Sequence, residues 1–134
     1  MEQLLEEIRS KEELLAIIIR SEYDKPGISF FTSSDNILQV GYMNYQEKKS
    51  IQPHIHNRYK REIYGTQEVI FIKKGKVKVS FYNKNKEFVS DRKLYTGDCV
   101  ALIDGGHGFE LLEPTKMIEV KNGPYAHDQD KIRF

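Results

Sequence analysis

The sequence predicts an all-β fold, an antiparallel sandwich or barrel preceded by a single N-terminal helix. The spacing of apolar residues changes once along the chain, near residue 21, from a helical period to alternation. About eight short strand-like runs follow, without a second helical run that could cross over a parallel sheet. The 134 residues suit one domain, so we expect residues 1–24 to form the helix and residues 25–134 the β structure.

The helix is expected between residues 2 and 20. Leu and Ile recur there at spacings of three, four and seven, with Glu and Lys between them, which is typical of an amphipathic helix. A kink or break is expected near Ser10. The segment "YDKPGI" ends the helix because Pro26 and Gly27 cannot continue its geometry.

The strands are expected where apolar, β-branched and aromatic residues alternate between Gly, Asn, Asp and Pro. The segment "YNKNKEF" predicts the clearest hairpin turn, because Asn83 and Asn85 tolerate the backbone angles of a tight reversal. The expected strands are Ile28–Thr32, Leu38–Tyr45, Glu68–Ile72, Lys76–Tyr82, Phe88–Leu94, Cys99–Ile103, Gly108–Leu112 and Met117–Lys121.

The composition argues against several classes of partner. A formal net charge of +1 gives no broad field for a nucleic acid or an anionic membrane, so we expect neither. Cys99 is the only cysteine, which excludes an internal disulfide and suits a reducing compartment. The N-terminus lacks signal-peptide features, and no run reaches the roughly 18 apolar residues of a membrane helix. We therefore expect a soluble cytoplasmic protein with a small-molecule ligand.

Two histidines and a glutamate suggest a site on the inner face of the sheet. One residue separates His54 from His56, so both rings project from the same face of an extended chain. Glu68 shares a face with Ile70 and Ile72, and would point inward with them. An isolated inward carboxylate costs several kcal/mol unless it is paired, protonated or bound to a metal.

A third histidine completes the expected set. His107 alternates with Phe109 and Leu111, which places its imidazole toward the apolar interior. Three imidazoles and one carboxylate suit a divalent transition metal such as Fe, Mn, Zn, Ni or Co, with positions left for water or substrate. Two alternatives stay open: Glu68 as a strand-edge acid paired with Arg58 or Arg61, and Gln67 as a ligand after a register slip of one residue.

At these residues the chain resembles the cupin superfamily, over roughly residues 38–121. The resemblance implies a cupin-type antiparallel β-barrel, or jelly roll, and the metal ligands His54, His56, Glu68 and His107. Eleven residues separate His56 from Glu68, which predicts a longer loop at the barrel mouth. The first cupin motif is matched by His54-Ile55-His56, Glu68 and Gly75, and the second by Gly97, "DCVAL", Ile103-Asp104-Gly105 and His107.

The expected activity is isomerisation or epimerisation of a small polar substrate, a sugar or a hydroxy or keto acid, with the metal polarising a carbonyl or hydroxyl. Glu119 or Tyr64 would act as acid and base, and Arg58, Arg61 and Lys121 would bind the substrate. The resemblance extends to small single-domain cupins of bacterial surface-sugar biosynthesis, which favours a carbohydrate. The alternatives are an iron-dependent dioxygenase, a non-catalytic metal- or ligand-binding module, and a metal-free epimerase with a histidine base.

A homodimer is also expected. Such a barrel exposes sheet edges and an apolar outer face, and the N-terminal segment offers more apolar surface than one short barrel covers.

Overall fold

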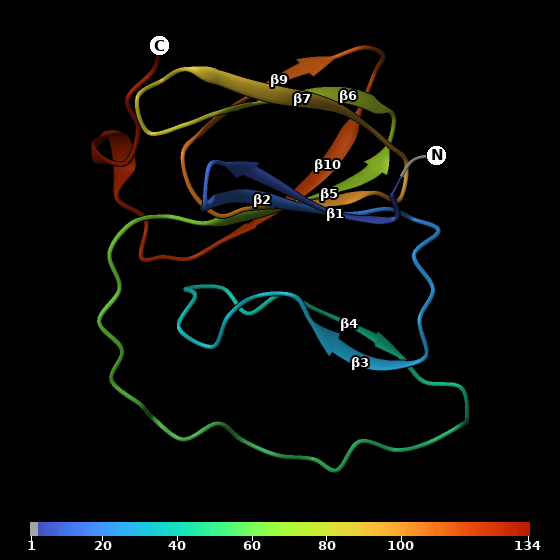
Figure 1. Cartoon of the computed structure of the whole chain (residues 1–134). Helices are drawn as coiled ribbons and strands as arrows, with labels where there is room; N and C mark the ends of the chain where they lie inside the picture. The colour runs from blue at the N-terminus through green and yellow to red at the C-terminus, as the bar shows by residue number, and fades with distance from the viewer. Residues whose placement is uncertain (1–2) are drawn as a thin grey trace.

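The computed structural model describes residues 3–134, which form ten β-strands and one short 3-10 helix (Figure 1). Every strand pairing is antiparallel. The strands are β1 (Leu5–Ser10), β2 (Glu13–Ile19), β3 (Gly27–Phe30), β4 (Gly41–Asn44), β5 (Glu68–Lys74), β6 (Lys76–Tyr82), β7 (Phe88–Tyr95), β8 (Cys99–Leu102), β9 (Gly106–Leu111) and β10 (Lys116–Lys121); the 3-10 helix is η1 (His127–Gln129).

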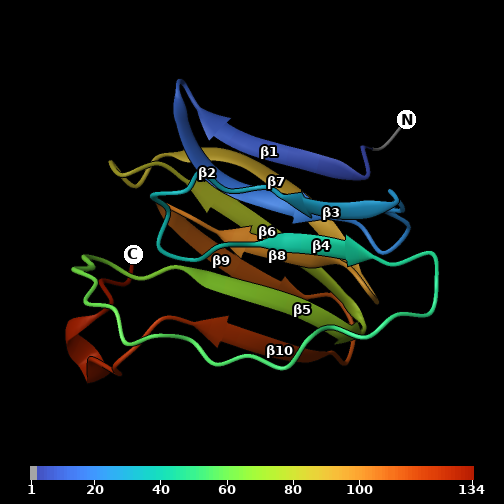
Figure 2. The same ribbon diagram turned by 90° about the horizontal axis from the view of Figure 1, so that it is seen from below.

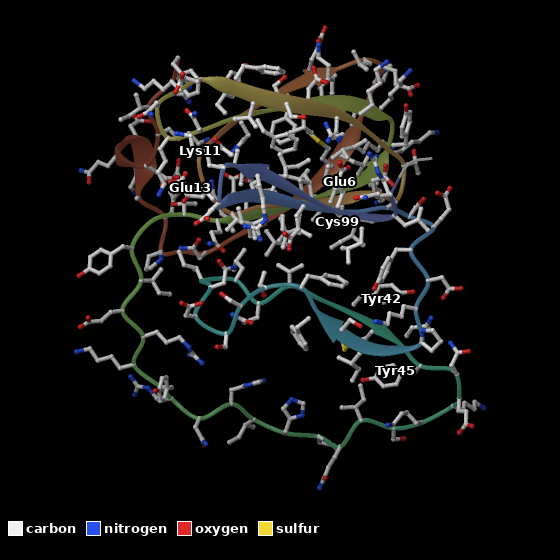
Figure 3. The ribbon with its side chains drawn as sticks, viewed as in Figure 1. Glu6, Lys11, Glu13, Tyr42, Tyr45 and Cys99 are labelled. Carbon is white, nitrogen blue, oxygen red and sulfur yellow. The ribbon has the colours of Figure 1, made fainter. Side chains whose placement is uncertain are left out.

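The strands form three sheets in three layers. The five-stranded sheet has the order β1-β2-β8-β5-β10, the three-stranded sheet the order β7-β6-β9, and β3 pairs with β4 in a separate hairpin. Figure 1 shows the five-stranded sheet between the other two, and Figure 2 shows the hairpin in front of it when seen from below. Glu6 and Cys99 lie in the five-stranded sheet, and Tyr42 and Tyr45 in the hairpin layer (Figure 3).

The hydrophobic core fills the space between the five-stranded and three-stranded sheets. Each sheet presents one face of alternating apolar side chains to the other, which is how two-layer β folds bury their strands. The five-stranded sheet contributes Ile8, Leu15, Ala16, Ile18, Ile70, Ile72, Val100 and Leu102, and the three-stranded sheet contributes Val77, Val79, Phe81 and Leu94.

The prediction of an N-terminal helix was wrong. Residues 5–19 form the antiparallel hairpin β1–β2, and the part of the chain from residue 3 onward contains no α-helix and no helix able to cross a membrane. The run from Leu15 to Ile18 is buried on both faces of β2, between β1 and β8. The sequence of a strand buried on both faces is a continuous run of apolar residues, and such a run also fits the spacing of an amphipathic helix. The β-branched isoleucines of this run favour the strand.

All eight strands predicted after residue 27 are confirmed, with ends shifted by a few residues at most. The turn between β6 and β7 is confirmed as well, and the Asn83 side chain accepts hydrogen bonds from the backbone N–H groups of Asn85 and Glu87. Lys86, rather than either asparagine, takes the left-handed backbone conformation, with a φ of 66°.

The two facing sheets are joined on one side and open on the other. On the joined side, Arg92 of β7 makes a bidentate ion pair with Glu6 of β1, with a shortest distance of 2.6 Å. On the open side, β9 and β10 are edge strands of their sheets within residues 3–134. None of the sheets closes into a barrel, and the open side is where the candidate site lies.

A long exposed segment, residues 45–65, connects the hairpin to β5 and is called the arm below. Every residue of the arm is exposed, and none belongs to a strand or helix. In Figure 1 the arm leaves β4, sweeps below the hairpin and returns to β5. The contacts that its side chains make are local, such as the cation–π contact between Arg61 and Tyr59.

A buried ion pair fixes the turn between β7 and β8. The Asp98 carboxylate lies 3.0 Å from the Arg20 guanidinium, and both side chains are almost fully buried. Asp98 also accepts hydrogen bonds from the backbone N–H groups of Ser21 and Tyr95, and Arg20 donates to the carbonyl of Lys93. One carboxylate therefore joins the end of β2 to the β7–β8 turn.

Replacing Asp98 with Ala should lower the free energy of unfolding by about 3–5 kcal/mol, because it leaves the Arg20 charge buried without its carboxylate. Urea unfolding at neutral pH measures this loss. The control is Glu110→Ala, which removes an exposed ion pair with Lys78 and should cost about 0–1 kcal/mol. Similar losses in the two variants would contradict the structural role of Asp98.

Candidate functional site

The open side of the sandwich holds a cavity of about 1070 Å³. Its walls come from β5, β6, β9 and β10, from the turns that follow β6 and β8, and from the C-terminal tail at residues 130–134. A cavity of this size accommodates a small molecule of metabolite size.

Three ionisable side chains converge in this cavity from three strands. Glu68 begins β5 and shares the inward face of that strand with Ile70 and Ile72. Glu119 of β10 lies opposite Ile70, so it points to the same inward face. His107 of β9 lies opposite the buried Phe81, and its Nε2 is 4.0 Å from a carboxylate oxygen of Glu68. Two carboxyl groups and an imidazole thus meet at the mouth of the core.

The two carboxyl groups share a proton. Burial, together with a hydrogen bond to Glu119, raises the pKa of Glu68 to about 7. That same hydrogen bond lowers the pKa of Glu119, with help from the nearby charges of Lys121 and Lys131. Glu68 therefore carries the proton and donates it to the ionised, more exposed Glu119.

His107 is held in its neutral form. Burial lowers its pKa, the charge of Lys131 lowers it further, and Glu119 opposes both effects only in part. A neutral imidazole can accept a proton or bind a metal ion.

Basic residues surround the rim of the cavity, and the C-terminal tail supplies two of them, Lys131 and Arg133. The tail is fixed at both ends: Thr66 donates a hydrogen bond of 2.5 Å to the Asp130 carboxylate, and the Phe134 ring lies 5.1 Å from the Tyr82 ring. The turn after β6 adds Lys84 and Lys86, of which Lys84 forms an ion pair of 3.1 Å with Asp104. The remaining cations can attract an anionic group of a ligand.

The arm carries the remaining residues that the sequence singled out. His54, His56, Arg58, Arg61 and Tyr64 are all exposed there, and none of the five lines the cavity that contains Glu68 and His107. The rings of the two histidines lie 5.2 Å apart, and Nδ1 of His54 lies 2.9 Å from the carbonyl oxygen of Gln52. Across residues 3–134, no group of three or more His, Cys, Asp or Glu side chains is arranged to hold a metal ion. The donors Glu68 and His107 alone do not form the expected set.

Three other predicted residues can be placed. Lys121 lies beside Glu119, with its Nζ 3.8 Å from the carboxylate, but does not line the cavity. Gln67 points away from the cavity, because its side chain forms a reciprocal amide pair with Asn36 at 2.8 Å. Cys99 is half-buried, and burial raises the pKa of its thiol to about 11, which fits a packing role.

Sequence reasoning missed the contribution of the C-terminal tail. The segment "DKIRF" resembles a solvated polar end, and an irregular tail has no periodicity that predicts where it packs. Its one signal is the pair of apolar residues, Ile132 and Phe134, which alternate with the basic Lys131 and Arg133.

No protein-family model matches the chain, and searches of curated proteins and of solved structures gave no match either.

The shared proton should make the stability of metal-free protein depend on pH. Between about 4.5 and about 7 the folded state keeps the proton on Glu68, whereas an unfolded chain has lost it. The contribution of Glu68 to stability is therefore full near the lower pH and falls by about 1–3 kcal/mol as pH rises to about 7. The lowered pKa of His107 acts in the opposite direction, so the difference between wild type and Glu68→Gln isolates the contribution of Glu68. Urea unfolding of chelator-treated protein across this range measures the effect.

Glu68→Gln, which keeps the shape and a hydrogen-bond donor, should remove most of this slope. The exposed Glu113→Gln serves as the matched control and should keep it. Equal slopes in wild type and Glu68→Gln would show that Glu68 titrates normally.

Proposed function

We propose that the chain is a cupin-type jelly-roll enzyme that isomerises a small anionic hydroxy-carbonyl compound, such as a phosphorylated sugar or a hydroxy or keto acid. The observation that carries this proposal is the convergence of Glu68, Glu119 and His107 in a cavity with a basic rim. The carbohydrate class rests on the resemblance of the histidine and glutamate motifs to cupins.

The strand connectivity supports the jelly-roll part of the proposal. From β5 onward the chain crosses repeatedly between the two facing sheets: β5, β8 and β10 lie in one, and the β6–β7 hairpin and β9 lie in the other. Alternation of antiparallel strands between two packed sheets is typical of Greek-key and jelly-roll folds.

Two adjacent carboxyl groups, one ionised and one protonated, can move a hydrogen between neighbouring carbons. The Glu119 carboxylate takes a proton from the carbon beside the carbonyl, while Glu68 donates its proton to the carbonyl oxygen. The resulting enediol then receives the Glu119 proton on the adjacent carbon, and the Glu68 carboxylate takes back a proton from the second hydroxyl. Both residues return to their starting states, so the reaction needs no external oxidant or reductant.

The basic residues determine the substrate class. Lys131 is close enough to influence the pKa of Glu68, Glu119 and His107, so an anionic group bound to it would lie near the reacting carbons. Arg133 and Lys86 extend this positive region along the same wall. A carboxylate or phosphate on the substrate fits such cations best.

A divalent transition metal belongs to the proposal as an addition to this acid–base pair. When bound, it would polarise the carbonyl or hydroxyl of the substrate. Of the expected ligands, only Glu68 and His107 line the cavity. Binding of the metal by all four residues would require the arm to move His54 and His56 to the cavity.

The activity can be tested by hydrogen exchange. Phosphorylated aldoses and ketoses, with α-hydroxy and α-keto acids, are incubated with the protein in deuterated water, and NMR detects deuterium at the carbon beside the carbonyl. Glu119→Gln should slow the exchange about a hundredfold or more, because it removes the base. Lys131→Ala should raise KM more than it lowers kcat.

The exposed Glu113→Gln is the matched control and should exchange like wild type. An unchanged rate in Glu119→Gln would contradict the proposed base. Absence of exchange with every compound of the panel would count against isomerisation and leave a binding module as the better description.

A further inference from the structure

The C-terminal tail connects the two facing sheets across the cavity (Figure 1). At its start, the Asp130 carboxylate accepts a hydrogen bond from Thr66, which lies just before β5 of the five-stranded sheet. At its other end, the Phe134 ring packs edge-on against the ring of Tyr82, the last residue of β6 in the three-stranded sheet. All five residues of the tail line the cavity, so the tail forms a wall on the open side of the sandwich.

Side chains, rather than backbone hydrogen bonds, hold the tail in place. In the part of the chain that the structure describes, no backbone–backbone hydrogen bond involves residues 130–134. The segment that holds the start of the tail is itself fixed, because Asn122 accepts a hydrogen bond from the backbone N–H of Gln67 and donates one to the carbonyl of Gly65. A segment without backbone hydrogen bonds keeps one position only where its side chains are held. The position of the tail therefore depends on the side-chain contacts at its two ends.

The Phe134 ring lies in a socket formed by Tyr82, Lys86 and Gly106. The centroid of the ring is 5.1 Å from that of Tyr82 and 6.0 Å from Nζ of Lys86. At Gly106, the first residue of β9, a Cβ atom would lie only 2.9 Å from the Phe134 ring. The φ of Gly106 is not in the left-handed region, so an alanine there would meet the ring without straining the backbone. Glycine at this position leaves the space that the ring occupies.

Between its two fixed ends the tail carries Lys131 into the cavity. The charge of Lys131 lowers the pKa of Glu68, Glu119 and His107, so its ammonium group lies near all three. We propose that Asp130 and Phe134 are positioning residues, which fix the ends of the tail and so hold Lys131 where it binds the anionic group of the substrate. This inference rests on the proposed function and names the residues that set its preference for an anionic substrate.

Fixing the tail in advance favours binding because a lysine side chain is flexible. Its four-carbon stem has many conformations, and a lysine on a loose segment would lose more freedom when it binds an anion. A segment that is already held in place avoids part of this cost, so the anion binds more tightly. Loss of either end contact should therefore weaken anion binding even though neither Phe134 nor Thr66 touches the anion.

Binding of inorganic phosphate to metal-free protein tests the positioning, with the dissociation constant measured by NMR titration. Lys131→Ala should weaken binding about tenfold or more, since it removes a charge-assisted contact. Phe134→Ala removes the ring, Gly106→Ala fills its socket, and Thr66→Val removes the hydrogen bond to Asp130. Each of these three variants should weaken binding about threefold to tenfold, the cost of ordering one flexible side chain.

Two variants serve as controls. Phe88 also packs edge-on against the Tyr82 ring, at 6.0 Å, and is exposed to a similar extent, but it does not line the cavity. Phe88→Ala should therefore bind phosphate like wild type. Phe134→Tyr keeps the ring and should also bind like wild type. Because the Phe134 ring is 63% exposed, urea unfolding of Phe134→Ala should remain close to that of wild type.

The double variant Lys131→Ala/Phe134→Ala separates positioning from a general disturbance of the cavity. If Phe134 acts through Lys131, its loss should weaken phosphate binding no further once Lys131 is absent. The same loss in both backgrounds would overturn the positioning of Lys131. Unchanged binding in Phe134→Ala and Gly106→Ala would overturn the role of the socket, and an equal loss in Phe88→Ala would show that the effect belongs to Tyr82.

Wild type that binds no phosphate, or Lys131→Ala that binds it as tightly as wild type, would overturn the tail as the anion-binding element. The acid–base proposal is judged separately, because deuterium exchange at the substrate carbon and its loss in Glu119→Gln require no phosphate measurement.

Discussion

The free edge on one side of the β sandwich is the constraint from which the other features follow. Backbone N–H and C=O groups at a sheet edge need partners, and side chains that face the core need cover. On one side these needs are met, because Glu6 and Arg92 join β1 to β7. On the other side β9 and β10 end their sheets, and the cavity lies at that opening. The same feature that leaves the fold incomplete therefore gives a small molecule access to three ionisable groups inside it.

The position of Glu68 at this opening gives two neighbouring carboxyl groups different pKa values. Glu68 as a residue is only 7% exposed, yet its carboxyl group is hydrogen-bonded to Glu119, which remains open to solvent. Burial disfavours the ionised form of Glu68, whereas the exposed Glu119 remains ionised. Such a division of one proton between two environments is how proteins assign acid and base roles to identical groups. A metal ion bound to Glu68 would compete with the proton for the same carboxylate and so change the protonation of the pair.

Much of this arrangement could be predicted from the sequence. The predictions were wrong where one pattern of apolar residues is compatible with two kinds of secondary structure. The eight strands after residue 27 follow from alternation with Gly and Asn turns, which few other structures satisfy. The N-terminal helix failed because the apolar run at Leu15 to Ile18 fits either a helix or a strand buried on both faces. Alternation predicted that Glu68 and His107 point inward, and the structure brings both together with Glu119, which was predicted as an acid–base residue. The buried pair of Arg20 with Asp98 had no local signal, because its members lie 78 residues apart. His54 and His56 lie exposed on the arm instead of in the cavity, because their position depends on contacts between elements, which residue spacing alone does not fix.

The central claim is that Glu68 holds a proton near neutral pH and donates it to the ionised Glu119, and carbon-13 NMR titration tests it most directly. Glutamate labelled at the side-chain carboxyl carbon is incorporated into metal-free protein, and the Glu68→Gln variant identifies the signal of Glu68. The account predicts that this carboxyl group titrates with a pKa of about 7. A pKa near the ordinary value of 4.5 would contradict it.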